Sequence, residues 1–131
     1  MQITLTNGEI LTLQAEINTV LQITKKTVAR FYLTSLFEKT TDALKPFTKV
    51  KEDLIKEKAT KDDEGNMVIK QYKEGVDPKN ATEADLTEGF KEYLELLKLD
   101  ATLEVKPIPV SNFEGLESDA IFPILTKFIE L

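Results

Sequence analysis

The sequence predicts a mostly helical α+β fold, in which a long kinked helix and two or three shorter helices pack against a small β-sheet. Helical spacing of apolar residues is strongest over residues 25–58 and recurs at about 13–22 and 83–98. Three short segments, 2–6, 67–73 and 102–108, have strand-like patterns. Because 41% of the 131 residues are hydrophobic, we expect a real core and one domain spanning residues 1–131.

The segment 25–58 predicts a helix with one apolar stripe. The stripe positions fall alternately four and three residues apart: Leu33, Phe37, Thr40, Leu44, Phe47, Lys51 and Leu54. That spacing places them on one helix face, which the rest of the chain or another copy must cover. The apolar members are therefore candidate core or interface residues: Leu33, Phe37, Leu44, Phe47 and Leu54.

Pro46 lies inside this helical pattern. Proline lacks a backbone N–H, and its ring clashes with the carbonyl group four residues earlier. The helix therefore either kinks near Asp42 and Ala43 or breaks and restarts with Pro46 in the first turn of a second helix. Because the apolar stripe keeps its phase on both sides of Pro46, we favour one kinked, continuous helix.

The N-terminal segment predicts a strand, a turn and a helix. Residues 2–6 alternate polar and apolar, and the following Asn7-Gly8 pair is typical of a turn. We expect Thr12 to cap a helix over about 13–22.

In the middle of the chain, residues 60–66 predict a charged turn that leads into the strand 67–73. Thr82, with Asp85 three residues later, predicts the start of the helix 83–98. Farther on, Pro107 and Pro109 confine the strand 102–108 to a sheet edge or to the end of a ladder. The terminal segment 121–131 is expected to be helical, with Pro123 in its first turn.

The composition excludes several enzyme classes. The chain has no Cys, His or Trp. Disulfides, thiolate nucleophiles and Ser-His pairs are therefore impossible, and no side chain has an unperturbed pKa near neutrality. We expect a protein that is not an enzyme, with no catalytic, cofactor-binding or metal-binding residues. A carboxylate-dependent enzyme is the remaining enzymatic alternative.

The acidic run Asp62-Asp63-Glu64-Gly65-Asn66 suggests a calcium loop. In an EF-hand, glycine is the sixth residue and a bidentate glutamate the twelfth. With Gly65 sixth, the loop would begin at Thr60 and end at Gln71, and neither residue supplies the carboxylate required there. We therefore interpret the run as a solvated turn.

Charge is distributed unevenly along the chain. Residues 25–58 hold nine basic and five acidic residues, whereas the remainder holds eight basic and eighteen acidic residues, within a net charge of −6. The acidic part either folds near the basic helix or pairs with another copy. A nucleic-acid face is disfavoured, because the acidic bulk repels phosphate. Three glutamates of the helix 83–98 share one face and are further interface candidates: Glu88, Glu92 and Glu95.

The sequence predicts no membrane span and no signal peptide. No apolar run approaches the ~20 residues that a spanning helix needs, and the first residues lack a basic start followed by an apolar block. We expect a cytoplasmic protein.

Several short motifs resemble those of a known group of proteins. The relevant segments are Asn7-Gly8-Glu9-Ile10, Leu54-Ile55-Lys56-Glu57-Lys58, the Asp-Glu-Gly-Asn turn before Met67-Val68-Ile69, and Phe113-Glu114-Gly115-Leu116. The last of these segments runs from Leu103-Glu104-Val105 to the Phe113 motif. In this order the segments resemble a family of small uncharacterised proteins encoded by phages and prophages. The family has no established catalytic residues to transfer. The resemblance implies a phage-encoded accessory protein that functions in virion assembly or host takeover.

Two functional hypotheses follow from these patterns. The first is a non-enzymatic phage protein that acts through protein–protein contacts, as an oligomer or with a partner, in virion structure or assembly. The second is an inhibitor that uses its acidic surface to bind a host defence or regulatory protein.

Overall fold

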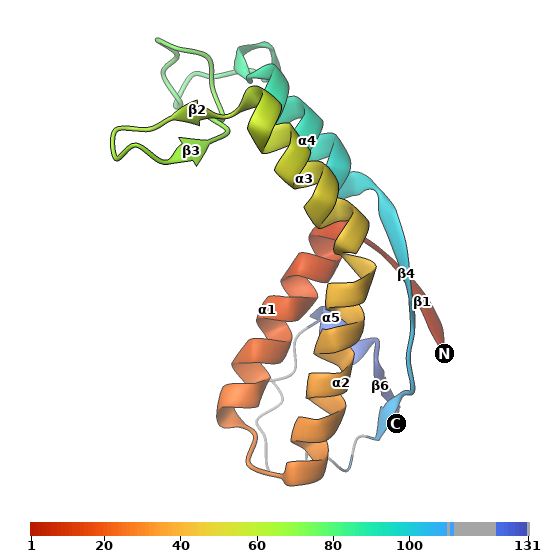
Figure 1. The fold of residues 1–131 in the computed structure, drawn as a ribbon. Coiled ribbons are helices and arrows are strands. Elements are labelled where there is room, and N and C mark those ends of the chain that lie inside the picture. The colour runs from red at the N-terminus through yellow and green to blue at the C-terminus, as the bar shows by residue number, and fades with distance from the viewer. Residues whose placement is uncertain (110, 112–122, 131) are drawn as a thin grey trace. The chain divides into compact units, whose positions relative to one another are not determined.

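The computed structural model describes residues 1–109, 111 and 123–130 and confirms a mostly helical α+β fold, with 57% of the described residues helical. Packing divides the chain into two compact units, Met1–Lys45 with the described part of Asp100–Leu131, and Pro46–Leu99. The first unit holds β1 (Gln2–Thr6), α1 (Asn7–Ile23), α2 (Thr27–Ala43), β4 (Asp100–Glu104), β5 (Ile108–Pro109), α5 (Pro123–Thr126) and β6 (Ile129–Glu130) (Figure 1). The second holds nearly all of α3 (Lys45–Lys58), β2 (Thr60–Lys61), β3 (Met67–Val68), the 3-10 helix η1 (Glu83–Asp85) and α4 (Glu88–Lys98).

The first unit contains an antiparallel two-stranded sheet made by β1 and β4. The predicted strand 2–6 is confirmed, and Ile3 pairs with Leu103 while Leu5 pairs with Ala101. Leu5 and Leu103 are buried on the same face of this sheet. In place of the predicted strand 102–108 there are two short strands, β4 and β5, because residues 105–107 between them belong to neither strand. β5 pairs in parallel with β6.

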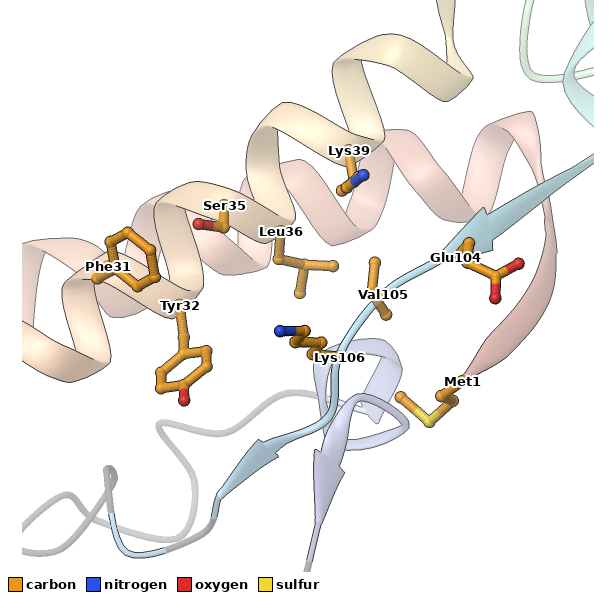
Figure 2. A pocket seen from close by; sticks show the side chains of 9 residues that line it. All are labelled: Met1, Phe31, Tyr32, Ser35, Leu36, Lys39, Glu104, Val105 and Lys106. Carbon is orange, nitrogen blue, oxygen red and sulfur yellow. The ribbon is translucent and has the colours of Figure 1, made fainter.

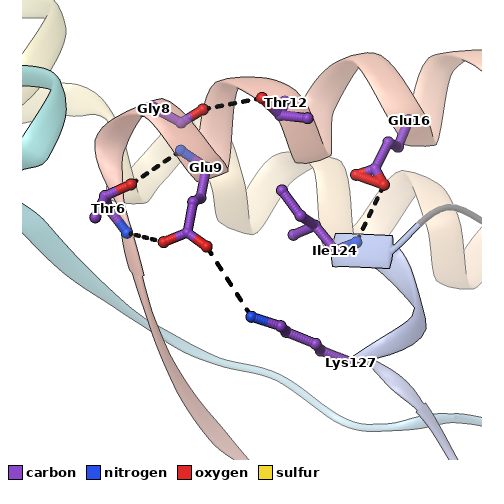
Figure 3. A network of polar contacts seen from close by, with 7 residues as sticks. All are labelled: Thr6, Gly8, Glu9, Thr12, Glu16, Ile124 and Lys127. Carbon is purple, nitrogen blue, oxygen red and sulfur yellow. Dashed lines mark hydrogen bonds and ion pairs between the residues drawn. The ribbon is translucent and has the colours of Figure 1, made fainter.

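α1 begins earlier than predicted, and no separate turn precedes it. The helix begins directly after β1, with Thr6 as N-cap, so Asn7 and Gly8 form its first turn. The Thr6 hydroxyl accepts from the Glu9 backbone N–H at 3.1 Å, and the Glu9 carboxylate accepts from the Thr6 backbone N–H at 3.0 Å (Figure 3). This capping box satisfies two donors at once and outweighs the turn preference of Asn-Gly. Thr12 is not a cap, and its hydroxyl donates to the Gly8 carbonyl inside the helix.

Helices α1 and α2 lie side by side and form the core of the first unit (Figure 1). Their fully buried apolar residues are Ile10, Leu13, Ile17, Val20, Ala29 and Leu33. Polar contacts also join the helices, since the Gln14 amide donates to the buried Thr40 hydroxyl at 3.0 Å and to the Thr41 hydroxyl at 3.4 Å. Thr40 in turn donates to the carbonyl oxygen of Phe37, so its hydroxyl is satisfied within the core.

The expected continuous helix over 25–58 is instead two consecutive helices, α2 and α3, separated at Leu44. Pro46 is the second residue of α3, which is the break-and-restart alternative. In the first helical turn a proline loses no hydrogen bond, since the N–H groups there have no acceptor within the helix. The first helix also starts later than predicted, at Thr27, because Thr24 closes α1.

The described C-terminal residues pack against α1. Within the described residues 123–130, only Pro123–Thr126 are helical (α5), so the predicted terminal helix 121–131 does not continue through residues 127–130. Phe128 and Leu125 are fully buried. The Phe128 carbonyl accepts from the Ile108 N–H at 2.8 Å, which joins this segment to β5. Residues 121 and 122 lie outside the described part of the chain.

In the second unit, α3 and α4 lie side by side (Figure 1). Gly89, in the first turn of α4, permits a close approach. A Cβ there would lie 2.9 Å from the Lys58 Cβ and 3.2 Å from the Ile69 Cγ2. Farther along the pair, the rings of Phe47 and Tyr93 have centroids 6.3 Å apart. The helix predicted over 83–98 is divided, because Thr82 and Asp85 cap only η1 while Thr87 caps α4.

The turn over 62–66 connects β2 to β3. One oxygen of Asp62 accepts from the backbone N–H groups of Glu64 and Asn66, and Gly65 has a φ of 85° that favours glycine. The ladder of β3 ends at Val68, short of the predicted strand 67–73, and pairing resumes only as a single bridge between Tyr72 and Leu86. None of the helices in the described part of the chain is long and apolar enough to cross a membrane.

Candidate functional site

A cavity of about 480 Å³ lies in the first unit, between α2 and the chain that leaves β4 (Figure 2). Its described lining is mainly apolar and aromatic: Met1, Phe31, Tyr32, Ser35, Leu36, Lys39, Glu104, Val105 and Lys106. A volume of this size lies within the usual range for ligand pockets and accommodates one or two large side chains of a partner.

Helical spacing brings the α2 residues to the cavity. Tyr32, Leu36 and Lys39 are four and three residues apart and therefore share one face of α2. On the other side, the Val105 N–H donates to the Met1 carbonyl at 3.0 Å, which extends the β1–β4 pairing by one residue and holds both side chains at the cavity.

The aromatic rim of the cavity is exposed. Phe31 is 68% exposed and Val28, one turn earlier on α2, is 57% exposed. The Phe31 ring meets the Tyr32 ring edge-on, with centroids 5.9 Å apart and an interplanar angle of 73°. A phenylalanine that leaves most of its ring in water retains an apolar area that a partner could cover.

Charged side chains flank the apolar lining. Lys39 and Lys106 are exposed cations, and Glu104 is an exposed anion. Arg30, by contrast, is used within the unit, since its guanidinium donates to the carbonyl oxygens of Leu21 and Thr24 at 2.7 and 3.1 Å. The charged groups lining the cavity are therefore predominantly basic, although the whole chain has a net charge of −6.

The predicted stripe residues are mostly inside the protein. Leu33, Leu44, Phe47 and Leu54 are buried, and Phe37 is half-buried. Little of these side chains therefore remains for an external partner.

The predicted acidic residues lie in the other unit. Glu88, Glu92 and Glu95 are exposed on α4, and none forms an ion pair with another described residue. They share a helix face but line none of the cavities described here.

The second unit has two smaller cavities. One, of about 260 Å³, lies against the ring of Tyr93, over which the Lys51 ammonium group lies at 5.7 Å. The other, of about 320 Å³, is lined in part by Lys58, Lys70 and Lys73.

The carboxylate of Glu9 serves a structural role in the capping box of α1. The pKa of Glu9 is lowered, chiefly because the Thr6 backbone N–H donates to its carboxylate, with Lys127 contributing at 4.0 Å. Among the described residues, no three acidic side chains gather closely enough to hold a metal ion.

Sequence reasoning did not select Phe31 and Val28. Both lie outside the phase of the Leu33 stripe, and that departure is the signal that could have identified a second apolar face on α2. Comparisons with protein-family models, with curated proteins and with solved structures found no match.

Proposed function

We propose that this chain is a non-enzymatic, phage-encoded accessory protein that acts through contacts with other proteins, as a structural or assembly component of the virion. The observation that carries the proposal is the exposed ring of Phe31 at the α2 cavity, together with the exposed Val28 one turn earlier on the same helix. The phage context is supported by the resemblance of the sequence motifs.

An exposed aromatic residue beside a cavity is typical of a binding surface. Aromatic side chains are enriched in the central parts of protein interfaces, where few residues supply most of the binding energy. Phe31 could lie over a partner, while the cavity beside it accepts a side chain from that partner (Figure 2).

The charges at the cavity indicate the chemistry of the partner. Lys39 and Lys106 outnumber Glu104, so an incoming segment with carboxylates is attracted and a basic one is repelled. The best-fitting partner segment therefore presents an apolar or aromatic side chain between acidic residues.

A phage that carries the double substitution Val28→Ser, Phe31→Ser tests this function. We expect a large loss of infectious particles and an accumulation of incomplete particles in electron micrographs of the lysate. The matched control is Val50→Ser, which removes a half-exposed valine (50%) from α3 that does not line the cavity. Normal particle yield from the double variant would contradict an assembly role for this surface.

The second candidate function, inhibition of a host defence or regulatory protein, is favoured by the exposed acidic face of α4. The triple reversal of Glu88, Glu92 and Glu95 to lysine should abolish such inhibition and leave the fold unchanged. The matched control reverses three exposed acids of α3: Glu52, Asp53 and Glu57. Equal effects of the two triple variants would remove the α4 face from consideration.

A further inference from the structure

The outer edge of β1 has backbone groups that face away from β4. In an antiparallel pair, residues alternate between those that exchange hydrogen bonds with the partner strand and those that do not. The Val105 N–H donates to the Met1 carbonyl, and Met1 lies opposite Val105 in the observed register. Ile3 and Leu5 therefore also bond to β4, whereas the N–H and C=O groups of Gln2 and Thr4 point outward.

The capping box agrees with this assignment. The same alternation directs the Thr6 N–H outward, and this group donates to the Glu9 carboxylate at 3.0 Å. The open part of the edge is therefore limited to Gln2 and Thr4, both of which are exposed. β1 has one neighbouring strand among the described residues, β4.

Unlike most edge strands, β1 carries nothing that prevents pairing with another chain. Its sequence, Gln-Ile-Thr-Leu-Thr, has no charge, no proline and no bulge. Natural edge strands usually carry lysines, prolines or bulges that discourage strand addition.

We propose that β1 pairs antiparallel with β1 of a second copy of this chain. One register uses all the outward groups: Gln2 lies opposite Thr4 of the second copy, and Thr4 lies opposite Gln2 of the second copy. Ile3 then lies opposite Ile3 of the second copy on the two-fold axis. The result is a continuous four-stranded sheet in the order β4, β1, β1, β4.

The side chains fit the same register. The face of the sheet that carries the buried Leu5 would bring together Ile3 with Ile3, and the 44% exposed Met1 with Leu5 of the second copy. The opposite face would bring together only Gln2 and Thr4, next to the observed Thr4–Thr102 hydroxyl contact of 3.2 Å. Because side chains alternate between faces, backbone and side-chain requirements agree in this register.

The outer edge of β4 does not offer this match. Its outward groups belong to Asp100, Thr102 and Glu104, and self-pairing there would place Asp100 opposite Glu104 of the second copy. Like charges directly across a strand pair are destabilising. The second copy is therefore assigned to β1. This inference does not rest on the function proposed for the α2 cavity, and the two share only the side chain of Met1, which also lines that cavity.

Sedimentation equilibrium of the purified chain over a wide concentration range tests the pairing. We expect a reversible dimer of twice the 14.8 kDa chain mass. The double variant Gln2→Lys, Thr4→Lys should weaken dimerisation by about tenfold or more, because two like-charged pairs arise across the strands. The variant Gln2→Lys, Thr4→Glu should restore it, since this register then pairs opposite charges.

The matched control is Thr102→Lys, which changes the hydroxyl partner of Thr4 on β4 without altering the β1 edge. Circular dichroism and thermal melting of each variant verify the fold. A monomer at all concentrations, or a dimer whose dissociation constant is the same in all four proteins, would overturn the proposal. A charge-swapped variant weaker than the lysine double variant would overturn the register.

Discussion

The carboxylate of Glu16, on α1, accepts a hydrogen bond of 3.1 Å from the backbone N–H of Ile124, in the first turn of α5 (Figure 3). Glu16 is 7% exposed, and its other oxygen, Oε2, is buried without a hydrogen-bond partner among the described residues. A single side chain in the core thus positions the described C-terminal segment on α1.

Replacing Glu16 with alanine should destabilise the protein by about 1–3 kcal/mol, because the Ile124 N–H loses a charged acceptor. Glu16→Gln should cost less, since the amide oxygen can accept the same bond. The midpoint and slope of urea unfolding measure both effects. Equal stability of Glu16→Ala and the unmodified protein would show that this bond does not hold α5.

A second prediction concerns how much the capping box at the start of α1 contributes to stability. Thr6→Ala removes the acceptor for the Glu9 N–H and should lower the free energy of unfolding by about 1 kcal/mol. Thr12→Ala, which removes only a hydroxyl bonded inside α1, is the control and should change stability much less. A larger effect at Thr12 would argue for the later helix start that the sequence pattern suggested.

The same box predicts a pH dependence. The pKa of Glu9 is lowered in the folded protein, so its contribution to stability is fully present above the ordinary carboxyl value of about 4.5. It is lost as the pH falls below that value and through the lowered pKa, because protonation then favours the unfolded chain. Urea titrations at several pH values should show that the free energy of unfolding falls less on acidification in Glu9→Gln than in the unmodified protein. An identical acid loss in both proteins would contradict this assignment.

Leu33 and Phe31 lie two residues apart on α2 in opposite environments. Leu33 is fully buried, so Leu33→Ala should cost about 2–5 kcal/mol through lost burial and a cavity. Phe31 is 68% exposed, and Phe31→Ala should change stability by roughly 0.5 kcal/mol or less. Thermal unfolding of the two variants measures the contrast, and a Phe31 effect as large as that of Leu33 would mean that the ring is covered.

Gly89 should not tolerate a side chain. A Cβ at this position would lie 2.9 Å from the Lys58 Cβ, an atom too close to the backbone to move freely. Gly89→Ala should therefore destabilise the protein by about 1–3 kcal/mol despite the better helix propensity of alanine. Glu92→Ala, on the exposed face of α4, is the control for propensity alone. A stabilised Gly89→Ala variant would show that α3 and α4 can separate slightly.

The spacing of apolar residues was sufficient to predict those parts of the fold that depend on neighbouring residues. The alternation over residues 2–6 predicted β1, and the three-and-four spacing predicted burial of Leu33 and Leu54. Each depends on period and burial, which a sequence displays directly. The class of fold follows from the same information.

Competition between local signals was harder to judge. Asn7-Gly8 favoured a turn, but the Thr6–Glu9 box, one residue earlier, favoured a helix and prevailed through two hydrogen bonds. At Pro46, the continuous stripe favoured one helix, whereas the missing N–H favoured a restart. In both places the alternatives differ by a small free energy, which pattern alone does not rank.

The sequence by itself determined the mostly helical α+β class, the main apolar stripe and the absence of thiol and imidazole chemistry, because these depend on residue type and spacing. Only the tertiary structure decided that β1 pairs with β4, that Glu16 holds Ile124 and that Phe31 borders a cavity. These relationships join residues far apart in the chain, and nothing in the local spacing specifies which distant segments pack together.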